Sequence, residues 1–480
     1  MSEKNLTTAQ VKKIKKSLPP SLLAIAKDID HAGGKLFLVG GFVRDFFLKR
    51  GKQGLAKDFD LEVFNLELFA LESILAKYGK PNQFGKSFGV ISLASFGHQF
   101  EFAMPRKETK NGKGHKGFVI ENNKSFDFAT SSLRRDFTIN AMGIDIVAAK
   151  IYDYYGGLKD LKSKTLRHVG KAFGEDPLRA LRAVQFAARL AFQIAPETIE
   201  VLRQQDLSEL PRERIYGEFA KLLLQAAKPS IGLSYLKECH LLRFFPELEA
   251  LVNCPQDPQW HPEGDVWIHT LMVVDEAAQL VRKERAQEEN INKLALMLGA
   301  LCHDLGKPLC TQLKDGRMRS IGHDVLGEAP TRSFLDRLTN NTKLIDAVVK
   351  LVLEHLRPVQ LYHLRHKVSE GAIKRLALRV DMEDLLLVAK ADFLGRTTEE
   401  AKKRRFFAGQ WLRKTLLKLN VAKKTLIPWL RGKDLLAMGL APGPIYAKII
   451  DESFELQLEG ELKSPADALS WAKKRIAAEL

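Results

Sequence analysis

The pattern of apolar and polar residues divides the chain into two regions. Between about residues 35 and 150, short apolar or alternating runs are typical of strands; they are KLFLVG, KDFDLEVF, FGVISLAS, HQFEFAM and INAMGIDIV. Residues 1–34 and the long region after residue 161 instead follow helical spacing. The sequence therefore predicts an α+β protein, in which a mixed-sheet domain is followed by a long, all-α body.

A glycine pair interrupts the first of these runs. The segment LFLVGGFVRDFFL (36–48) predicts a strand that turns at Gly40 and Gly41 into a helix. Glycine lets the backbone approach a ligand closely, and a helix start offers unpaired N–H groups to phosphate. Arg44 adds a guanidinium suited to phosphate oxygens. A tight turn with a surface ion pair between Arg44 and Asp45 would give the same pattern.

Two carboxylates follow on the next predicted strand, KDFDLEVF (57–64). Side chains two positions apart on a strand point to the same face, so Asp58 and Asp60 should project together. Adjacent carboxylates repel each other unless a cation lies between them, and Mg²⁺ takes oxygen ligands together with substrate phosphates. We predict that this pair holds Mg²⁺. Glu101 is the candidate third carboxylate, and a solvent-facing strand position is its alternative.

Three further segments shape the end of the sheet region. SLRRDFTINAM (132–142) has two arginines and an aspartate before what we expect to be an apolar helix. The stretch between Pro105 and Phe118 is rich in glycine and lysine without periodicity, which predicts a mobile loop. IYDYYGGLKDL (151–161) has a turn at Gly156–Gly157 that is expected to end the sheet domain.

The segment GEDPLRALRAVQFAARL (174–190) predicts another helix. Asp176 is expected at its N-cap and Pro177 at its first position, with Arg179 and Arg182 one turn apart on roughly one side. In one interpretation Asp176 caps its own helix and does nothing more. In the other, Asp176 and Arg179 present an acceptor and a donor fork to the edge of a nucleobase.

Composition and charge narrow the class of partner. The 480 residues carry a formal net charge of +17 with a sequence pI of about 9.5, which favours a polyanionic partner such as nucleic acid. No apolar run approaches the roughly 20 residues of a membrane-spanning helix, and the N-terminus lacks the apolar core of a signal peptide. The four cysteines lack CxxC spacing and indicate reduced thiols in the cytoplasm; they are Cys239, Cys254, Cys302 and Cys310.

Histidines and aspartates in the helical region suggest a second metal site. An H…HD…D set of imidazoles and carboxylates suits a divalent transition metal with open positions for water, whereas scattered surface histidines are the alternative. The set comprises His269, His303, Asp304 and Asp392. His323 and His355 are candidates for holding a second ion.

The segment KKRRFFAGQWLRK (402–414) combines basic and aromatic side chains near the C-terminus. Its lysines and arginines could contact phosphates, so that affinity would fall with added salt. Phe406, Phe407 and Trp411 could stack on bases, but their helical spacing favours packing in a core.

The motifs occur in a distinctive order: LVGGFVRD, DFD, RRDFTINA, DYYGGLKDL and EDPLRALR. Over about residues 35–250 this order closely resembles class II tRNA nucleotidyltransferases, the CCA-adding enzymes, and the related bacterial poly(A) polymerases. The resemblance implies a polymerase-β-like nucleotidyltransferase head and a helical neck that holds a protein template for ATP and CTP. It also implies that the body and tail bind tRNA.

The resemblance also implies residue roles, which we transfer position by position. Mg²⁺ would bind Asp58 and Asp60. The nucleotide would contact the glycine turn, two arginines of the head and three neck residues; these nucleotide-binding residues are Gly40, Gly41, Arg44, Arg135, Asp176, Arg179 and Arg182. The histidine–aspartate set with HDLGK resembles the HD phosphohydrolase domain of some bacterial CCA-adding enzymes. That domain implies phosphatase, 2′-nucleotidase and 2′,3′-cyclic phosphodiesterase activity with Ni, Mn, Fe or Co.

Several alternatives remain open on sequence alone. The loop before Phe118 matches one that A-adding enzymes need, which argues against a CC-only enzyme. Gln185 stands where many relatives carry arginine, which leaves an A-only or poly(A) role open. A different class is an HD phosphohydrolase whose head only senses nucleotides, and both monomer and homodimer are possible.

The expected domain division has five parts. Pro, Asp and Gly cluster near residues 250–262, and a second boundary is expected near residues 425–432. The parts are a helical lead-in (1–34), a catalytic head (35–160), a helical neck (161–255), an HD domain (256–400) and a basic, tRNA-binding tail (401–480).

Overall fold

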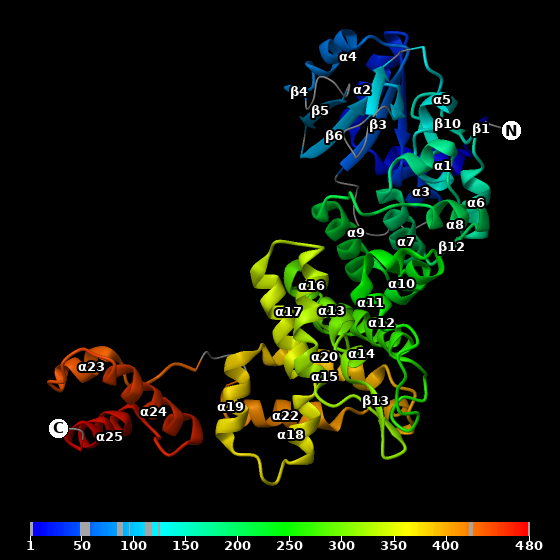
Figure 1. The fold of residues 1–480 in the computed structure, drawn as a ribbon. Coiled ribbons are helices and arrows are strands. Elements are labelled where there is room, and N and C mark those ends of the chain that lie inside the picture. The colour runs from blue at the N-terminus through cyan, green and yellow to red at the C-terminus, as the bar shows by residue number, and fades with distance from the viewer. Residues whose placement is uncertain are drawn as a thin grey trace. The chain divides into compact units, whose positions relative to one another are not determined.

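The computed structural model describes residues 3–48, 58–83, 90–95, 97–110, 118–122, 125–421 and 426–478. The chain divides into two compact units (Figure 1). The first unit comprises Met1–Leu222 and Tyr235–Phe244, and the second comprises Leu223–Ser234 and Phe245–Leu480.

A mixed sheet forms the centre of the first unit. Its strands follow the order β1-β10-β9-β2-β3-β6-β5-β4, in which β3 and β6 are parallel and all other neighbours are antiparallel. The bounds are β1 Glu3–Asn5, β2 Lys35–Val39, β3 Asp58–Phe64, β4 Pro81–Gln83, β5 Val90–Ser95, β6 His98–Ala103, β9 Gly143–Asp145 and β10 Lys150–Tyr152. The prediction of a mixed sheet is confirmed.

The first eleven α-helices, between Thr8 and Glu249, include helices that pack through a regular apolar face. In α2 the residues Leu22, Ile25, Ala26 and Ile29 repeat at helical spacing, and all are buried as the helix packs against β2. The helices are α1 Thr8–Ser17, α2 Pro20–His31, α3 Gly41–Phe47, α4 Leu68–Leu75, α5 Phe128–Ser132, α6 Gly157–Ser163, α7 Leu178–Leu190, α8 Pro196–Arg203, α9 Arg212–Gln225, α10 Pro229–Glu238 and α11 Pro246–Glu249.

The sequence predicted a purely helical N-terminal segment, and this prediction was wrong because the segment begins with a strand. Strand β1 pairs antiparallel with β10, with Lys4 opposite Ile151, and so extends one edge of the sheet. All three residues of β1 are exposed. A strand that buries no side chains leaves no alternating pattern, and backbone pairing alone places it here.

Two other predictions near the sheet were wrong. The first residues of the expected loop form a strand, because β7 (Arg106–Lys110) pairs antiparallel with β8 (Phe118–Asn122); residues 111–117 lie outside the described residues. The expected apolar helix after Asp136 is only a 3-10 helix, Thr138–Asn140, followed by β9. This segment is buried almost throughout, and a short apolar run buried on all sides does not distinguish helix from strand.

Four helices form the core of the second unit: α12 (Val266–Glu284), α13 (Asn290–Cys302), α17 (Thr342–Glu354) and α20 (Met382–Leu394). Gly299 allows α13 to pack closely, since a Cβ at this position would lie 3.0 Å from a Leu351 side-chain atom. The remaining elements are α14 Lys307–Cys310, α15 His323–Leu326, α16 Glu328–Asp336, α18 Arg357–His363, α19 Glu370–Arg379, α21 Glu399–Lys402, α22 Phe407–Lys418 and the hairpin of β13 Gln312–Lys314 with β14 Arg317–Arg319. Two-residue strands β11 Thr165–Leu166 and β12 Gln193–Ile194 pair in the first unit.

The C-terminal helices enclose a small apolar core of their own. They are α23 (Gly432–Ala437), α24 (Ile445–Glu459) and α25 (Pro465–Ala477). Helix α24 packs against α19, where Lys374 donates a hydrogen bond of 2.9 Å to the Leu458 carbonyl.

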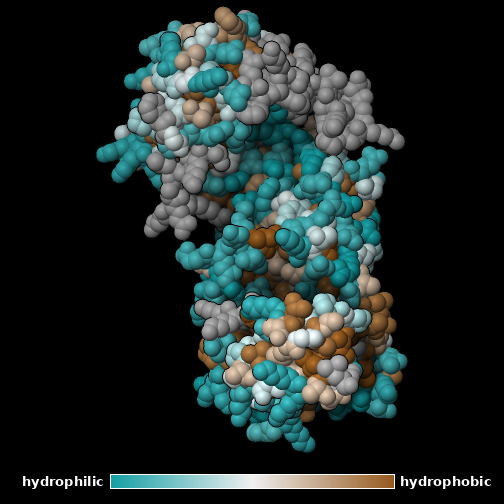
Figure 2. Space-filling view, turned by 90° about the vertical axis from the view of Figure 1, so that its left-hand side faces the viewer, coloured by the Kyte–Doolittle hydropathy of each residue, from teal (hydrophilic) through white to brown (hydrophobic). Residues whose placement is uncertain are grey.

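Polar side chains cover most of the face drawn in Figure 2, with apolar side chains gathered on its lower part. In the predicted basic segment, Phe406 is buried and Trp411 contacts the Tyr362 ring edge-on, whereas Phe407 is 54% exposed. Packing is therefore confirmed for the first two rings and wrong for Phe407. Among the residues that the structure describes, no helix combines the length and apolar character needed to cross a bilayer.

Candidate active sites

The predicted turn between β2 and α3 is present and closely surrounded. Gly40 has φ +67° and ψ −135°, and α3 begins at Gly41. A Cβ on Gly40 would lie 3.1 Å from Asp60 Oδ2 and 3.6 Å from Arg135 Nη1. Both the backbone conformation and the lack of space therefore require glycine. The fold brings together the turn, a predicted metal ligand and a predicted nucleotide contact, and we call this group the triphosphate site.

The strand register adds the third predicted carboxylate to the triphosphate site. Strand β3 carries Asp58 and Asp60, and Asp60 is paired with Glu101 on the parallel neighbour β6. Residues paired in register point to the same face of a sheet, and both Asp60 and Glu101 are exposed there. The backbone position of Asp58 agrees with the prediction, but its side chain lies outside the described residues. A donor set of exposed carboxylates on one face fits Mg²⁺.

Sequence reasoning missed Glu62, the next residue on the same face of β3. Its side chain is fully buried and accepts hydrogen bonds from Arg134 Nη2 at 3.1 Å, Arg135 Nη2 at 3.2 Å and the Ser131 hydroxyl. Burial alone would raise the pKa of Glu62, but Arg135 and Arg134 outweigh it and lower the pKa, so the carboxylate is ionised. The alternation Asp-x-Asp-x-Glu was the available signal.

Arg44 forms the ion pair that was the alternative to phosphate binding, but with the arginine buried. The Arg44 side chain is only 7% exposed, whereas that of Asp45 is 45% exposed. Arg44 Nε lies 2.8 Å from Asp45 Oδ1, and Arg44 Nη1 donates to Asn140 Oδ1 at 3.0 Å. These contacts hold Arg44 beside the glycine turn, with Nη2 3.5 Å from the Cβ position of Gly41.

The expected cap of α7 is displaced by one residue. Pro177 is the N-cap residue and the helix begins at Leu178, so the prediction that Asp176 caps the helix was wrong. The carboxylate of Asp176 still accepts a hydrogen bond from the Leu178 N–H at 3.1 Å. Its other oxygen pairs with Arg214 Nη2 at 2.9 Å, which sequence reasoning did not foresee. Because proline carries no N–H, Leu178 supplies the first donor that Asp176 can reach.

Arg179 and Arg182 are both held by protein groups. Arg179 donates to the carbonyl oxygens of Ala172 and Arg134, each at 2.6 Å. Arg182 donates through Nε and Nη2 to Asp136 Oδ2, at 2.8 and 2.6 Å. These bonds give each guanidinium a fixed orientation and connect α7 to the segment that contains Arg135.

Gln185, the departure from the family pattern, is buried and accepts a hydrogen bond of 3.0 Å from Arg189. Three guanidinium groups surround the neighbouring Phe186 ring, those of Arg44, Arg182 and Arg189, at 5.2 to 5.4 Å from its centroid. This cluster concentrates positive charge near one end of α7, where a polyphosphate would be attracted.

The histidines and aspartates of the second predicted site also meet, and we call this group the HD centre. One set of possible ligand atoms lies within 4.8 Å of one another and comes from three parts of the chain: His269 of α12, His303 directly after α13 and Asp392 of α20. A second such set comprises Asp304, His323 and His355. All six side chains are buried, so the alternative of scattered surface histidines is wrong.

Backbone carbonyls fix the tautomers of three of these histidines. Each Nδ1 lies within hydrogen-bonding distance of the carbonyl oxygen three residues earlier. A carbonyl only accepts, so Nδ1 carries the hydrogen, and in the neutral imidazole Nε2 keeps a lone pair. The pairs are His303 with Ala300 at 2.8 Å, His323 with Ser320 at 2.7 Å and His355 with Val352 at 2.6 Å.

These lone pairs face carboxylate oxygens. His303 Nε2 lies 3.1 Å from Asp304 Oδ2 and His323 Nε2 lies 3.3 Å from Asp304 Oδ1. Neither imidazole nitrogen has a well-oriented hydrogen-bond partner within the described part of the chain. Two acceptors directed at each other repel, and a cation between them removes the repulsion. The donor set therefore fits a divalent metal ion with nitrogen and oxygen ligands.

Glu263 and His261 belong to this centre but were missed from the sequence. Glu263 Oε1 lies 2.8 Å from His269 Nδ1 and 2.9 Å from His261 Nδ1. The hydrogen bond to His269 directs its Nε2 toward Asp392, 3.1 Å away. The signal was present in WHPEGDVWIH, where both residues precede His269 by less than nine positions.

Two cations hold the buried aspartates. Lys307 Nζ lies 2.7 Å from Asp304 Oδ2, and Arg396 Nη2 lies 2.9 Å from Asp392 Oδ2. Burial alone would raise the pKa of both carboxylates. The pKa of Asp304 is nevertheless held well below its usual range by His303, when that ring is protonated, and by Lys307, and Arg396 with protonated His269 does the same for Asp392. Both cations follow their aspartates at helical spacing, in HDLGK and ADFLGR, and could have been found there.

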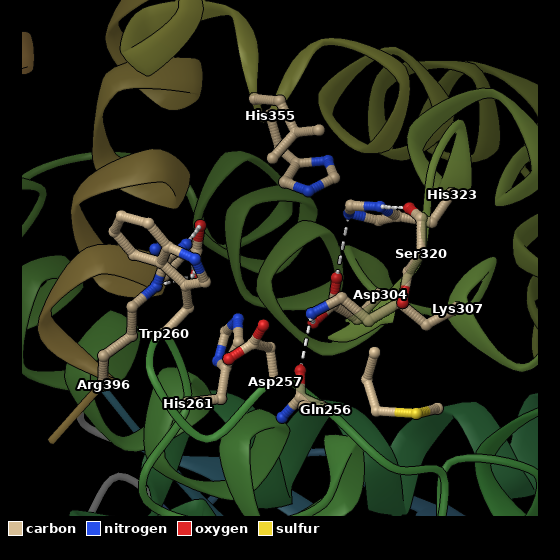
Figure 3. A pocket seen from close by; sticks show the side chains of 13 residues that line it. Gln256, Asp257, Trp260, His261, Asp304, Lys307, Ser320, His323, His355 and Arg396 are labelled. Carbon is tan, nitrogen blue, oxygen red and sulfur yellow. Dashed lines mark hydrogen bonds and ion pairs between the residues drawn. The ribbon is translucent and has the colours of Figure 1, made fainter. Parts of the chain in front are cut away.

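A cavity of about 230 Å³ opens onto the HD centre (Figure 3). Polar and charged side chains line most of it, and they include Asp304, Lys307, His323 and Arg396. Burial lowers the pKa of His261, which also lines it, to about 4, so this imidazole is neutral at neutral pH.

Comparisons with known proteins match this arrangement in three parts. Residues 36–167 match the poly A polymerase head domain, residues 191–251 match the probable RNA and SrmB-binding site of polymerase A, and residues 266–394 match the HD domain. The fold and the two sites therefore define a nucleotidyltransferase joined to a metal-dependent phosphohydrolase domain.

Relatives identify the family more closely. The multifunctional CCA protein of Xanthomonas campestris pv. campestris is 36% identical over 382 residues, which cover 76% of this chain and 86% of that protein. The multifunctional CCA protein of Pasteurella multocida is 37% identical over 381 residues, covering 76% and 84%. The chain belongs to the family of multifunctional CCA proteins, as its motifs had indicated.

Solved structures agree on the fold. The CCA-adding enzyme of Bacillus stearothermophilus in complex with CTP aligns with a TM-score of 0.65 at 20% identity, covering 96% of this chain and 99% of that one. The Thermotoga maritima CCA-adding enzyme complexed with tRNA aligns with a TM-score of 0.61 at 18% identity, covering 99% and 100%. The predicted head followed by a helical body is confirmed.

Proposed function

We propose that this chain adds or repairs the 3′-terminal CCA of tRNA from CTP and ATP without a nucleic-acid template. One observation carries the proposal for the head: Asp60 and Arg135 meet at the Gly40 turn, and Glu101 is in register with Asp60. The names of the relatives, multifunctional CCA proteins, support CCA as the product. The charge of +17 agrees with tRNA as the partner.

In this proposal Asp58, Asp60 and Glu101 hold Mg²⁺, and the turn at Gly40–Gly41 leaves room for the triphosphate. Bound Mg²⁺ would neutralise phosphate charge and orient the 3′-hydroxyl of the tRNA against the α-phosphate. Arg44 and Arg135 approach the same turn and would bind phosphate oxygens.

The start of α7 would select the base. Asp176 accepts and Arg179 donates hydrogen bonds, which suits them to the edge of cytosine or adenine, and Arg182 would support the nucleotide. Their bonds to Arg214, to carbonyl oxygens and to Asp136 support this role, because a template made of protein must be rigid.

Gln185 keeps A-only or poly(A) addition as the alternative for the head. Incubation of the protein with tRNA lacking CCA and with each nucleoside triphosphate alone, then with CTP and ATP together, separates the two. Two CMP additions followed by one AMP support the proposal. An unbounded A tract, or AMP addition only to a tRNA that already ends in CC, contradicts it.

The HD centre would be a second active site, which hydrolyses 2′-phosphates and 2′,3′-cyclic phosphates. Its ligand set favours Ni, Mn, Fe or Co, and such an ion would supply an activated water and polarise the phosphate. Lys307, held between Asp304 and Gln256, would contact a phosphate oxygen of the substrate. Removal of a cyclic phosphate from a damaged tRNA end would restore the hydroxyl that the head requires.

Paired variants test whether the two sites are independent. We expect replacement of His303 and Asp304 by alanine to abolish phosphodiesterase activity while nucleotide addition continues. Asp60→Ala should do the reverse. The alternative, an HD phosphohydrolase whose head only senses nucleotides, instead predicts that Asp58→Ala leaves the principal cellular activity of the protein intact.

The tail, the cysteines and the oligomeric state bear on where and with what the protein acts. The exposed basic side chains of the tail, residues 401–480, would contact tRNA phosphates, and binding should weaken with salt. The four free cysteines agree with action in the cytoplasm. Monomer and homodimer are distinguished by the mass of the purified protein in solution, and limited proteolysis would test the five-part domain division.

A further inference from the structure

One aromatic side chain in the HD cavity has no part in the metal-binding set. Trp260 lines the cavity, and 55% of its surface is exposed. A ring that is exposed and also lines a cavity is available to pack against a bound molecule. The turn that carries Trp260, residues 257–261, includes one possible metal ligand, the neighbouring His261.

An ordered turn holds Trp260 in place. The N–H groups of Trp260 and His261 both donate to the carbonyl oxygen of Asp257, at 3.1 and 2.9 Å. The Asp257 carboxylate accepts a further hydrogen bond of 2.9 Å from the N–H of Gln259. The ring is therefore presented by a fixed backbone, and little conformational freedom is lost when a flat group packs against it.

The cavity offers different chemistry on its two sides. Figure 3 shows Lys307 and His323 on one side of the pocket, and the ring of Trp260 on the other side together with Arg396 and His261. Lys307 can bind a phosphate, and the possible metal ligands lie around it. A phosphate held by Lys307 leaves the Trp260 ring without a contact, whereas a nucleoside phosphate also carries a flat base that can pack on the ring.

We propose that Trp260 is a base-stacking residue, and that the HD cavity takes the nucleoside of its substrate as well as its phosphate. This inference rests on the proposed phosphohydrolase function and adds how that site distinguishes nucleotides from small phosphoesters. Stacking on one aromatic ring accepts every base because each has a π-face. The subsite therefore distinguishes nucleotides from other phosphoesters without choosing among the four bases.

Steady-state kinetics with matched substrates test this. The substrates are adenosine 2′-monophosphate, cytidine 2′-monophosphate and glycerol 2-phosphate, which has no base. We expect Trp260→Ala to raise KM for both nucleotides by about tenfold, the typical effect of removing one stacking ring. KM for glycerol 2-phosphate should not change, and Trp260→Phe should retain most of the affinity for nucleotides.

A control variant and the remaining outcomes complete the test. Phe69 on α4 is an aromatic residue that is 79% exposed and does not line the cavity, so Phe69→Ala should leave all three KM values unchanged. An equal rise of KM for nucleotides and glycerol 2-phosphate in Trp260→Ala would overturn the stacking role alone. If the unaltered protein hydrolyses none of the three compounds, the proposed hydrolase function fails and this inference fails with it.

Discussion

Glu62 and Arg135 are joined by a hydrogen bond of 3.2 Å between Oε2 and Nη2, and this bond connects strand β3 to an arginine that we propose contacts the nucleotide. Glu62 follows Asp60 by two residues on β3. The other terminal nitrogen of Arg135 lies 3.6 Å from the Cβ position of Gly40. One buried carboxylate therefore fixes the distance between the metal-binding face of β3 and an arginine predicted to contact the nucleotide.

We expect Glu62→Gln to reduce nucleotide addition mainly by raising KM for CTP and ATP. The neutral amide cannot balance Arg134 and Arg135, so Arg135 loses its fixed orientation. The free energy of unfolding should fall by about 2 kcal/mol, as for a lost hydrogen bond to a charged group. Nucleotide incorporation and thermal denaturation measure the two effects.

The matched control is Glu209→Gln, a change of the same size at an exposed glutamate of the first unit. It should leave both KM and stability unchanged. The positioning role of Glu62 is wrong if Glu62→Gln lowers stability without raising KM for nucleotides, since a purely structural residue would behave in that way. Hydrolysis at the HD centre serves as an internal check that the protein remains folded.

Glu101→Gln distinguishes a metal ligand from a solvent-facing strand residue. Because Glu101 is in register with Asp60, we expect the loss of its charge to reduce kcat for nucleotide addition on the order of 100-fold, the scale for one electrostatic group in a transition state. Raising Mg²⁺ concentration should recover part of the loss. An unchanged kcat would return Glu101 to the solvent-facing interpretation.

Glu263→Gln tests the orientation of His269. Without the carboxylate on Nδ1, the imidazole is less basic and less firmly oriented, so metal affinity should fall by about 10- to 100-fold. Metal content after dialysis and competition with a chelator measure this directly. Excess metal should restore hydrolysis, and nucleotide addition should be unaffected; a variant that keeps full metal content after dialysis contradicts the role.

The pair of Asp136 and Arg182 predicts a defined pH dependence of stability. Burial alone would raise the pKa of Asp136, but Arg182 outweighs it and lowers the pKa below its ordinary value. In the unfolded chain the pKa of an aspartate is about 3.9. Because the pKa of Asp136 is lower in the folded state, the folded state binds fewer protons in this pH range. The ionised Asp136 carboxylate therefore stabilises the folded state fully above the unfolded pKa, and this stabilisation is lost as the pH falls through the lower pKa of the folded state.

Thermal unfolding of Asp136→Asn and the unaltered protein measures this contribution. The difference in Tm should be largest above about pH 5 and should shrink as the pH approaches about 3. Asp206, whose side chain is exposed, is the control, and Asp206→Asn should give a much smaller difference at every pH. A difference that grows on acidification would contradict the assignment.

The sequence predicted those site residues whose spacing follows the side-chain period of the helix or strand that carries them. Asp58 and Asp60 follow strand alternation, and the turn at Gly40 joins an apolar strand to a helix. The family order of motifs then identified Arg135 and Asp176. The histidines of the HD centre were found from the H…HD…D set of imidazoles and carboxylates, which resembles the HD domain as a whole although no single member of it is specific.

What the sequence did not predict depends on contacts between distant segments. Glu62 differs from a surface acid only because Arg134 and Arg135, 72 and 73 residues later, pack over it. Glu263 gains its role from the turn that brings it to His269. Strand β1 exists because the sheet edge at β10 offers it a backbone partner, and no side-chain pattern records that.

Gly40 offers the sharpest test of the triphosphate site because its backbone and its surroundings can be separated. Gly40 and Gly33, which lies just after α2, both have positive φ, +67° and +82°. A Cβ at Gly33 would meet nothing within 4 Å, whereas one at Gly40 would lie 3.1 Å from Asp60 Oδ2.

Alanine at either position should therefore reduce stability, by about 1 to 2 kcal/mol for the left-handed conformation. Only Gly40→Ala should also abolish nucleotide addition, because it displaces Asp60 and fills the space intended for the triphosphate. If both variants add nucleotides equally well, the glycine turn does not face the substrate, and the arrangement of the triphosphate site proposed from it is wrong.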